Sequence, residues 1–117
     1  MDTNYEQVAR DIFDIIDYIN GSLSGGIEAP RRVLDVTADE NAVSILYTYS
    51  PICGLSDCVY HDTRAGKNYT DTFEFSENKI LLNGEENIFA KAAQGFEDTD
   101  YVKEAIDGFY AKYPVYA

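Results

Sequence analysis

The sequence has few of the residues that usually form cross-links or carry catalysis. Its 117 residues include two cysteines, one histidine and no tryptophan. Two cysteines and one histidine do not supply a disulfide framework, and they fall short of the four ligands of a structural zinc site. Any mechanism that uses a histidine as acid or base must pass through His61.

Basic residues are also scarce. Nine Lys and Arg stand against 21 Asp and Glu, which gives a formal net charge of −12. Such a surface repels phosphate backbones and anionic lipid headgroups, so we expect no direct binding to nucleic acid or membranes. A basic protein is the expected partner. The alternative is that the acidity only keeps the protein soluble.

Long apolar runs and nucleotide-binding or catalytic signatures are missing as well. No window approaches the roughly 20 apolar residues of a membrane-spanning helix, and residues 1–16 lack the basic start and apolar core of a signal peptide. We therefore expect reduced cysteines and a cytoplasmic location. Glycine-rich phosphate loops, H-E-x-x-H, EF-hand and G-x-S-x-G patterns are absent, so we expect no cofactor and no enzymatic activity.

The composition nevertheless predicts a folded chain. Hydrophobic residues make up 45% of the sequence, and ten Tyr and six Phe are too many for a disordered acidic tail. The length suits one domain with one core, and no polar or Pro-rich linker divides it. We expect a single acidic domain over residues 1–117.

The first segment has the period of a helix. Residues 3–6 have the spacing of a capping box, with Thr3 as N-cap and Glu6 reaching back, and Gly21 is placed to end the helix. Its apolar stripe recurs every three or four residues: Tyr5, Val8, Ile12, Ile15, Ile16 and Ile19. Residues 22–30 contain two glycines and a proline and predict a connection.

Between residues 31 and 83 the period changes to two, which predicts strands. We expect strands at residues 31–37, 42–49 and 69–75, a weaker one at 58–62, and a further one at 79–82. The first two flank a short polar link and should pair antiparallel. In the second strand one face is apolar and should be covered: Val43, Ile45, Tyr47 and Tyr49.

Helical periodicity returns after Gly84. It predicts a short helix over 88–93 that ends at Gly95, and a last helix that starts at Asp98 or Thr99 and stops at Pro114. The predicted fold class is α+β: an N-terminal helix, an antiparallel four- or five-stranded sheet, and two C-terminal helices packed on one face. The predicted core includes Ile12, Ile16, Ile45, Phe73, Phe75, Ile106 and Phe109.

One row of acids stands out on the first helix. Asp11, Asp14 and Asp17 share part of the polar face, repel one another, and have only Arg10 as a close cation along the helix. By contrast, the acids at the start of the last helix complement its dipole: Glu97, Asp98 and Asp100. We therefore predict a partner-binding face formed by Asp11, Asp14, Asp17, Tyr5 and Tyr18. The alternative is an ordinary solvated helix face.

Cys53, Cys58 and His61 form a C-x4-C-x2-H pattern beside Asp62. As a metal site it needs Asp62 as fourth ligand, and as a thiol nucleophile it needs His61 as base. A disulfide across the loop is a third reading, and ordinary reduced cysteines are the expected state.

Three functions remain open on the sequence. The favoured one is a stoichiometric binder or inhibitor of a basic protein that handles nucleic acid, such as a nuclease. Toxin-immunity proteins and phage anti-defence proteins share this size, charge and class, although no motif here matches a particular family. The second is a small enzyme or metal protein centred on Cys53, Cys58 and His61. The third is a structural homodimer that uses exposed aromatic residues: Tyr47, Tyr49, Tyr113 and Tyr116.

Overall fold

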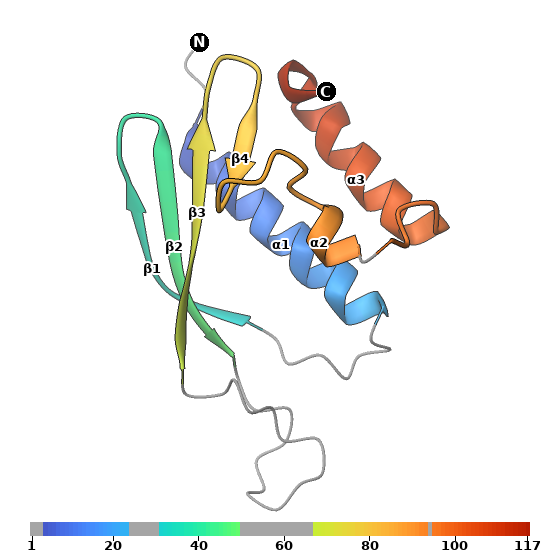
Figure 1. Ribbon diagram of the computed structural model, residues 1–117, viewed down its shortest axis with the longest axis horizontal. Coiled ribbons are helices and arrows are strands. Elements are labelled where there is room, and N and C mark those ends of the chain that lie inside the picture. Colours follow the sequence, from blue (N-terminus) through green and yellow to red (C-terminus); the bar gives the residue numbers. More distant parts are fainter. Residues whose placement is uncertain (1–3, 24–30, 50–66, 94) are drawn as a thin grey trace, which may run out of the picture.

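The structure is a computed structural model that describes residues 4–23, 31–49, 67–93 and 95–117. It confirms the predicted α+β class, with an N-terminal helix, an antiparallel sheet and C-terminal helices (Figure 1). In chain order the elements are α1 (Tyr5–Leu23), β1 (Arg31–Ala38), β2 (Ala42–Tyr49), β3 (Asn68–Phe75), β4 (Ile80–Leu82), α2 (Ala90–Ala93), α3 (Asp100–Lys112) and a 3-10 turn (Pro114–Tyr116).

α1 begins with a different cap from the predicted one. The Asn4 side-chain oxygen accepts a hydrogen bond from the Gln7 backbone N–H at 3.1 Å, whereas Thr3 lies outside the described residues. The helix continues to Leu23, so the prediction that Gly21 ends it is wrong. A glycine inside a helix costs only about 1 kcal/mol, and the packing of the apolar stripe outweighs that cost.

The sheet is a four-stranded antiparallel meander in the order β1-β2-β3-β4. The β1–β2 hairpin closes with a bond of 2.8 Å from the Asp39 N–H to the Ala42 carbonyl. On the covered face of the sheet, Ile45 lies opposite Val36 of β1 and Asp71 of β3. The predicted strand at 58–62 falls outside the described residues, and the predicted last strand is present as β4.

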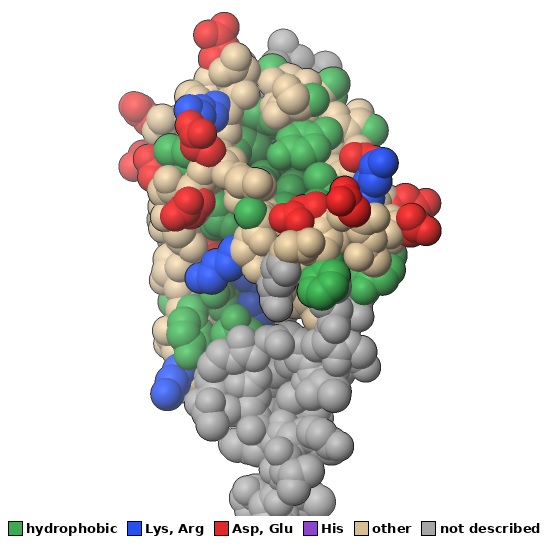
Figure 2. Space-filling view, turned by 45° about the vertical axis from the view of Figure 1, so that its right-hand side comes forward, with side chains coloured by type: hydrophobic (Ala, Val, Ile, Leu, Met, Phe, Trp, Pro, Cys, Tyr) green, Lys and Arg blue, Asp and Glu red, His purple; other side chains and the backbone are tan. Residues whose placement is uncertain are grey.

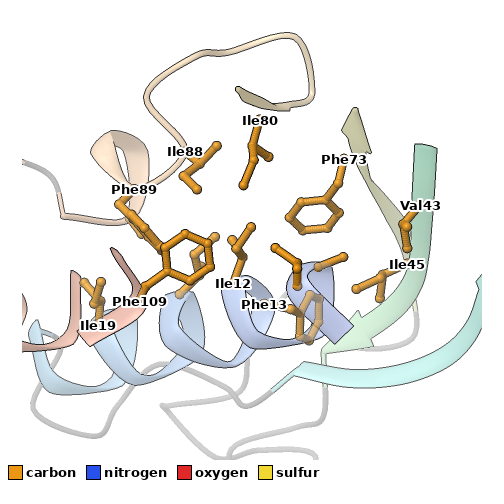
Figure 3. Packing of buried hydrophobic residues seen from close by; sticks show 14 of the residues in the cluster. Ile12, Phe13, Ile19, Val43, Ile45, Phe73, Ile80, Ile88, Phe89 and Phe109 are labelled. Atoms are coloured by element: carbon orange, nitrogen blue, oxygen red, sulfur yellow. The ribbon is translucent and has the colours of Figure 1, made fainter. Parts of the chain in front are cut away.

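All three helices lie on the same side of the sheet, and α1 contacts both the sheet and the other two helices. Figure 3 shows Ile12 of α1 between Phe73 of β3 and Phe109 of α3. Of the seven core residues predicted from the sequence, six are buried, whereas Ile106 is only half-buried. Ile106 lines a surface hollow beside α3 together with Phe89 and Tyr110, which explains its partial exposure.

The four tyrosines proposed as an exposed aromatic patch do not form one. Tyr47 is buried, and Tyr49, Tyr113 and Tyr116 are half-buried against the core. Tyr47 packs edge-on against Phe13 at 5.3 Å between ring centroids. These rings therefore pack mainly against the core and do not form an open aromatic surface.

Among the described residues, no helix has the length and apolar content needed to cross a membrane.

Candidate functional site in the groove between α1 and α3

The structure gives Asp11 of α1 partners from the C-terminal end of α3. The Lys112 ammonium donates to its carboxylate at 2.8 Å, the Tyr113 hydroxyl donates to the same oxygen, and the Gln7 side chain donates at 2.9 Å. Burial raises the pKa of Asp11, but these hydrogen bonds and the charge of Lys112 outweigh it and hold the pKa below its ordinary value. Asp11 therefore ties α1 to α3.

Asp17 has a different internal partner. The guanidinium of Arg31, whose side chain is only 4% exposed, bonds to Asp17 and also to Asp71 at 3.1 Å. Burial raises the pKa of Asp17 by more than the attraction of Arg31 lowers it. Asp17 therefore belongs to a buried ion-pair cluster rather than to an open surface.

The expectation that Arg10 is the only cation near the acidic row is therefore wrong. Lys112 and Arg31 bond to two of the three acids, and Arg10 pairs with Glu6 one turn earlier at 3.3 Å. Lys112 is distant in sequence, and Arg31 lies outside the helix, so helical spacing could not place either cation. Asp14 is exposed and makes no ion pair with any described residue.

Asp14 lines a groove between α1 and α3 with a volume of about 290 Å³. Its apolar base comes from the buried Phe109 and the half-buried Ile15 and Ala105. The remaining lining residues are Asp11, Glu104, Gly108, Lys112 and Tyr113. We call this the α1–α3 groove. The groove combines this apolar base with three carboxylates, and one of them, Asp11, is already bonded to Lys112.

Glu104 is the groove acid that the sequence did not single out. It is exposed, lies on α3 across the groove from Asp14, and makes no ion pair within the described part of the chain. Gly108, one turn further along α3, leaves the space above it open, because a Cβ added there would meet nothing within 4 Å. The helical spacing of α3 places Glu104 and Gly108 on one face of that helix. Only the packing of α3 against α1 shows that this face lies opposite Asp14.

A second hollow, of about 250 Å³, lies on the other side of α3. Three acids line it, Glu97, Asp98 and Asp107, together with the Phe89 and Tyr110 rings. The sequence assigned Glu97 and Asp98 to the helix dipole, and in the structure they line this hollow, as does Lys103. Figure 2 shows acidic side chains spread over the face on which α3 comes forward.

The two predicted contact tyrosines behave differently. Tyr5 stacks on Phe75 at 4.5 Å between ring centroids and is half-buried, so it mainly serves the core. Tyr18 is 53% exposed. It follows Asp11 by seven residues and Asp14 by four, so it continues the α1 side of the groove by one helical turn. Tyr18 is therefore the predicted tyrosine that remains open to a partner.

The alternative site lies outside the described residues. Cys53, Cys58, His61 and Asp62 all fall in the stretch 50–66. Within the described ranges, no group of three or more Cys, His, Asp or Glu side chains is arranged to hold a metal ion.

Comparison with protein families, with curated proteins and with solved structures found no match for the chain.

The contacts of Asp11 give a first prediction. Asp11→Asn should lower the free energy of unfolding by roughly 1–2 kcal/mol at neutral pH, because the charge that accepts the Tyr113 hydrogen bond is lost. A carboxylate whose pKa is lowered by folding stabilises the protein above its unfolded pKa of about 4 and stops doing so as the pH falls through the folded value. Urea denaturation of both proteins should therefore show a difference at pH 7 that closes below about pH 4. A difference that persists at low pH would contradict the role of the charge.

Proposed function

We propose that the protein is a small acidic binding module that engages a basic surface of a partner protein through the α1–α3 groove. The supporting observation is that two carboxylates without an ion pair in the described residues, Asp14 and Glu104, stand over an apolar base in one groove. The net charge of −12 favours the same class of partner through long-range attraction.

The groove fits the chemistry of an arginine or lysine side chain. The aliphatic stem of such a side chain packs on apolar surface, here Ile15 and Phe109, while its charged head remains near carboxylates. A guanidinium bonded to a carboxylate forms the stronger, charge-assisted type of hydrogen bond. Asp14 and Glu104 are the carboxylates that accept these hydrogen bonds, because Asp11 is already bound to Lys112 and Tyr113.

We propose further that the protein acts by stoichiometric inhibition in the cytoplasm, as immunity or anti-defence proteins do. A protein that handles nucleic acid carries the basic surface that this groove suits. Covering that surface with an acidic protein would block access of the nucleic acid without any chemical reaction.

The test uses two variants with equal loss of charge. Asp14→Asn with Glu104→Gln removes the open acids of the groove, and Glu74→Gln with Glu77→Gln removes two exposed acids on β3 and the following turn. Wild type and both variants serve as bait in extracts of the native host. The proposal predicts a basic protein that wild type and the Glu74/Glu77 variant retain and the Asp14/Glu104 variant loses. A basic protein retained equally by all three would contradict the groove as the binding site.

Uncharged substitutions at Gly108 test whether a partner side chain enters the groove without changing the charge of the groove. Gly108→Ala should raise the free energy of unfolding by about 0.5–1 kcal/mol, because alanine is the better helix former and its methyl meets open space. Gly108→Gln should also fold, but its longer side chain projects into the groove and should weaken partner binding. Urea denaturation and binding measured on both variants check the two effects. Full binding by the Gln variant would contradict insertion of a partner side chain at this position.

A further inference from the structure

β1 forms one edge of the sheet. It pairs with β2 and with no other described strand. Four successive residues on this edge, 32–35, are exposed, and two of them are large and apolar: Val33 at 38% and Leu34 at 42%. An edge strand presents unpaired backbone N–H and C=O groups on its open side, so it is a template for pairing with another strand.

A bulge in β1 changes which of its residues share a face. Arg32 lies opposite Thr48 and Asp35 lies opposite Leu46, with a shift of register between Val33 and Asp35. Thr48 and Leu46 are two residues apart on β2 and so share a face, which places Arg32 and Asp35 on that same face. In a regular strand, residues three apart lie on opposite faces. The bulge therefore puts one cation and one anion on the same side of the edge.

We propose that β1 pairs antiparallel with β1 of a second copy of the chain, across a two-fold axis between residues 33 and 34. This register places Arg32 opposite Asp35 of the second copy and Val33 opposite its Leu34. Opposing residues in an antiparallel pair must share a face, and the bulge meets that condition for Arg32 and Asp35. The two-fold axis repeats each contact, so one register gives two ion pairs, with the exposed Val33 and Leu34 of both copies between them.

The charges on this edge favour a second copy over the basic partner of the groove. Arg32 and Asp35 make no ion pair among the described residues, and together they are neutral. A basic strand would bring a like charge to Arg32, whereas an identical strand satisfies both charges. Pairing across a two-fold axis occupies the β1 edge of both copies, so a closed dimer is the expected assembly.

Charge reversal tests the register directly. Light scattering on eluted peaks over a concentration series should give wild type twice the chain mass of 13.1 kDa. Arg32→Asp and Asp35→Arg each oppose like charges, and each should weaken the dimer about tenfold or more. An equimolar mixture of the two variants brings Asp and Arg together at both positions and should restore the dimer, as should the double variant. Circular dichroism melts of the variants show that they fold.

The outcomes are decisive in both directions. Asp35→Arg reduces the net negative charge of the chain, so its dissociation cannot result from general repulsion. Wild type that is monomeric at every concentration would overturn the proposal. Dimers that survive both single reversals, or single variants that the mixture fails to restore, would also overturn it. Partner binding at the α1–α3 groove is a separate readout and does not depend on this result.

Discussion

Arg31→Met is expected to lower the free energy of unfolding by about 3–5 kcal/mol, because it removes the cation from a buried ion-pair cluster. The Arg31 side chain is 4% exposed, and its guanidinium donates to Asp17, to Asp71 and to the Phe13 carbonyl at 2.7 Å. It also lies 3.5 Å from the centre of the Phe13 ring. Methionine fills part of this volume but leaves two carboxylates without their cation.

The carboxylates explain why the loss is large. Asp71 is buried on the covered face of the sheet and accepts hydrogen bonds from Arg31, from Asn83 at 3.2 Å and from the Tyr47 hydroxyl at 3.4 Å. Burial raises the pKa of Tyr47, so its phenol stays protonated and continues to donate. Without Arg31, however, the negative charge of Asp71 is no longer balanced, and a buried unpaired charge is strongly unfavourable.

Arg10→Met is the matched control for this prediction. Arg10 forms an exposed pair with Glu6 one helical turn away, so its replacement should cost less than 1 kcal/mol. Adding Asp17→Asn and Asp71→Asn to Arg31→Met should recover part of the lost stability, because the unpaired charges are removed. Urea denaturation at pH 7 measures all of these proteins. If Arg31→Met proves as mild as Arg10→Met, the buried ion-pair cluster does not hold α1 to the sheet.

Phe109→Ala is expected to cost about 3–5 kcal/mol, which threatens a domain of ordinary stability. The Phe109 side chain is 2% exposed, packs edge-on against Phe89 at 5.4 Å between ring centroids, and lies 5.1 Å from the Tyr113 ring. It also forms the base of the α1–α3 groove. Truncation removes a large buried surface and leaves a cavity between the helices.

Phe96→Ala provides the control with the same chemistry. Phe96 is 56% exposed, so its loss should change stability by about 0.5 kcal/mol or less. Thermal and urea unfolding of the two variants compares one buried and one exposed ring directly. Similar losses for both would mean that α3 does not pack on α1 as described.

Most of the fold could be predicted because each element carries its own period. The α1 stripe, the alternation in β2 and the α3 stripe each specify a buried face without knowledge of the rest. Two predictions were wrong, the helix end at Gly21 and the burial of Ile106, because the spacing of residues along the chain did not decide either of them. Gly21 is a typical helix end in sequence, but α1 continues past it to Leu23. Ile106 is apolar and correctly spaced, but it lies at the margin of α3 beside a hollow.

The site was less predictable because it depends on contacts between distant segments. Lys112 and Tyr113, which bond to Asp11, are about a hundred positions away from it, and Arg31 lies on a strand beyond α1. The helical pattern therefore could not reveal that cations bond to two acids of the row. The same packing brings Glu104 and Gly108 opposite Asp14. Asp14 and Tyr18 are the members of the predicted face that remain open to a partner.

The most direct test of the binding proposal is the association rate of the captured partner, measured against salt concentration for wild type and the two charge-matched variants. Loss of Asp14 and Glu104 should slow association most at low salt and speed dissociation at all salt concentrations, because the two acids both attract the partner and contact it. Loss of Glu74 and Glu77 should change only the low-salt association rate, through the smaller net charge. The proposal is contradicted if the Asp14/Glu104 variant, like the Glu74/Glu77 variant, dissociates from the partner at the wild-type rate.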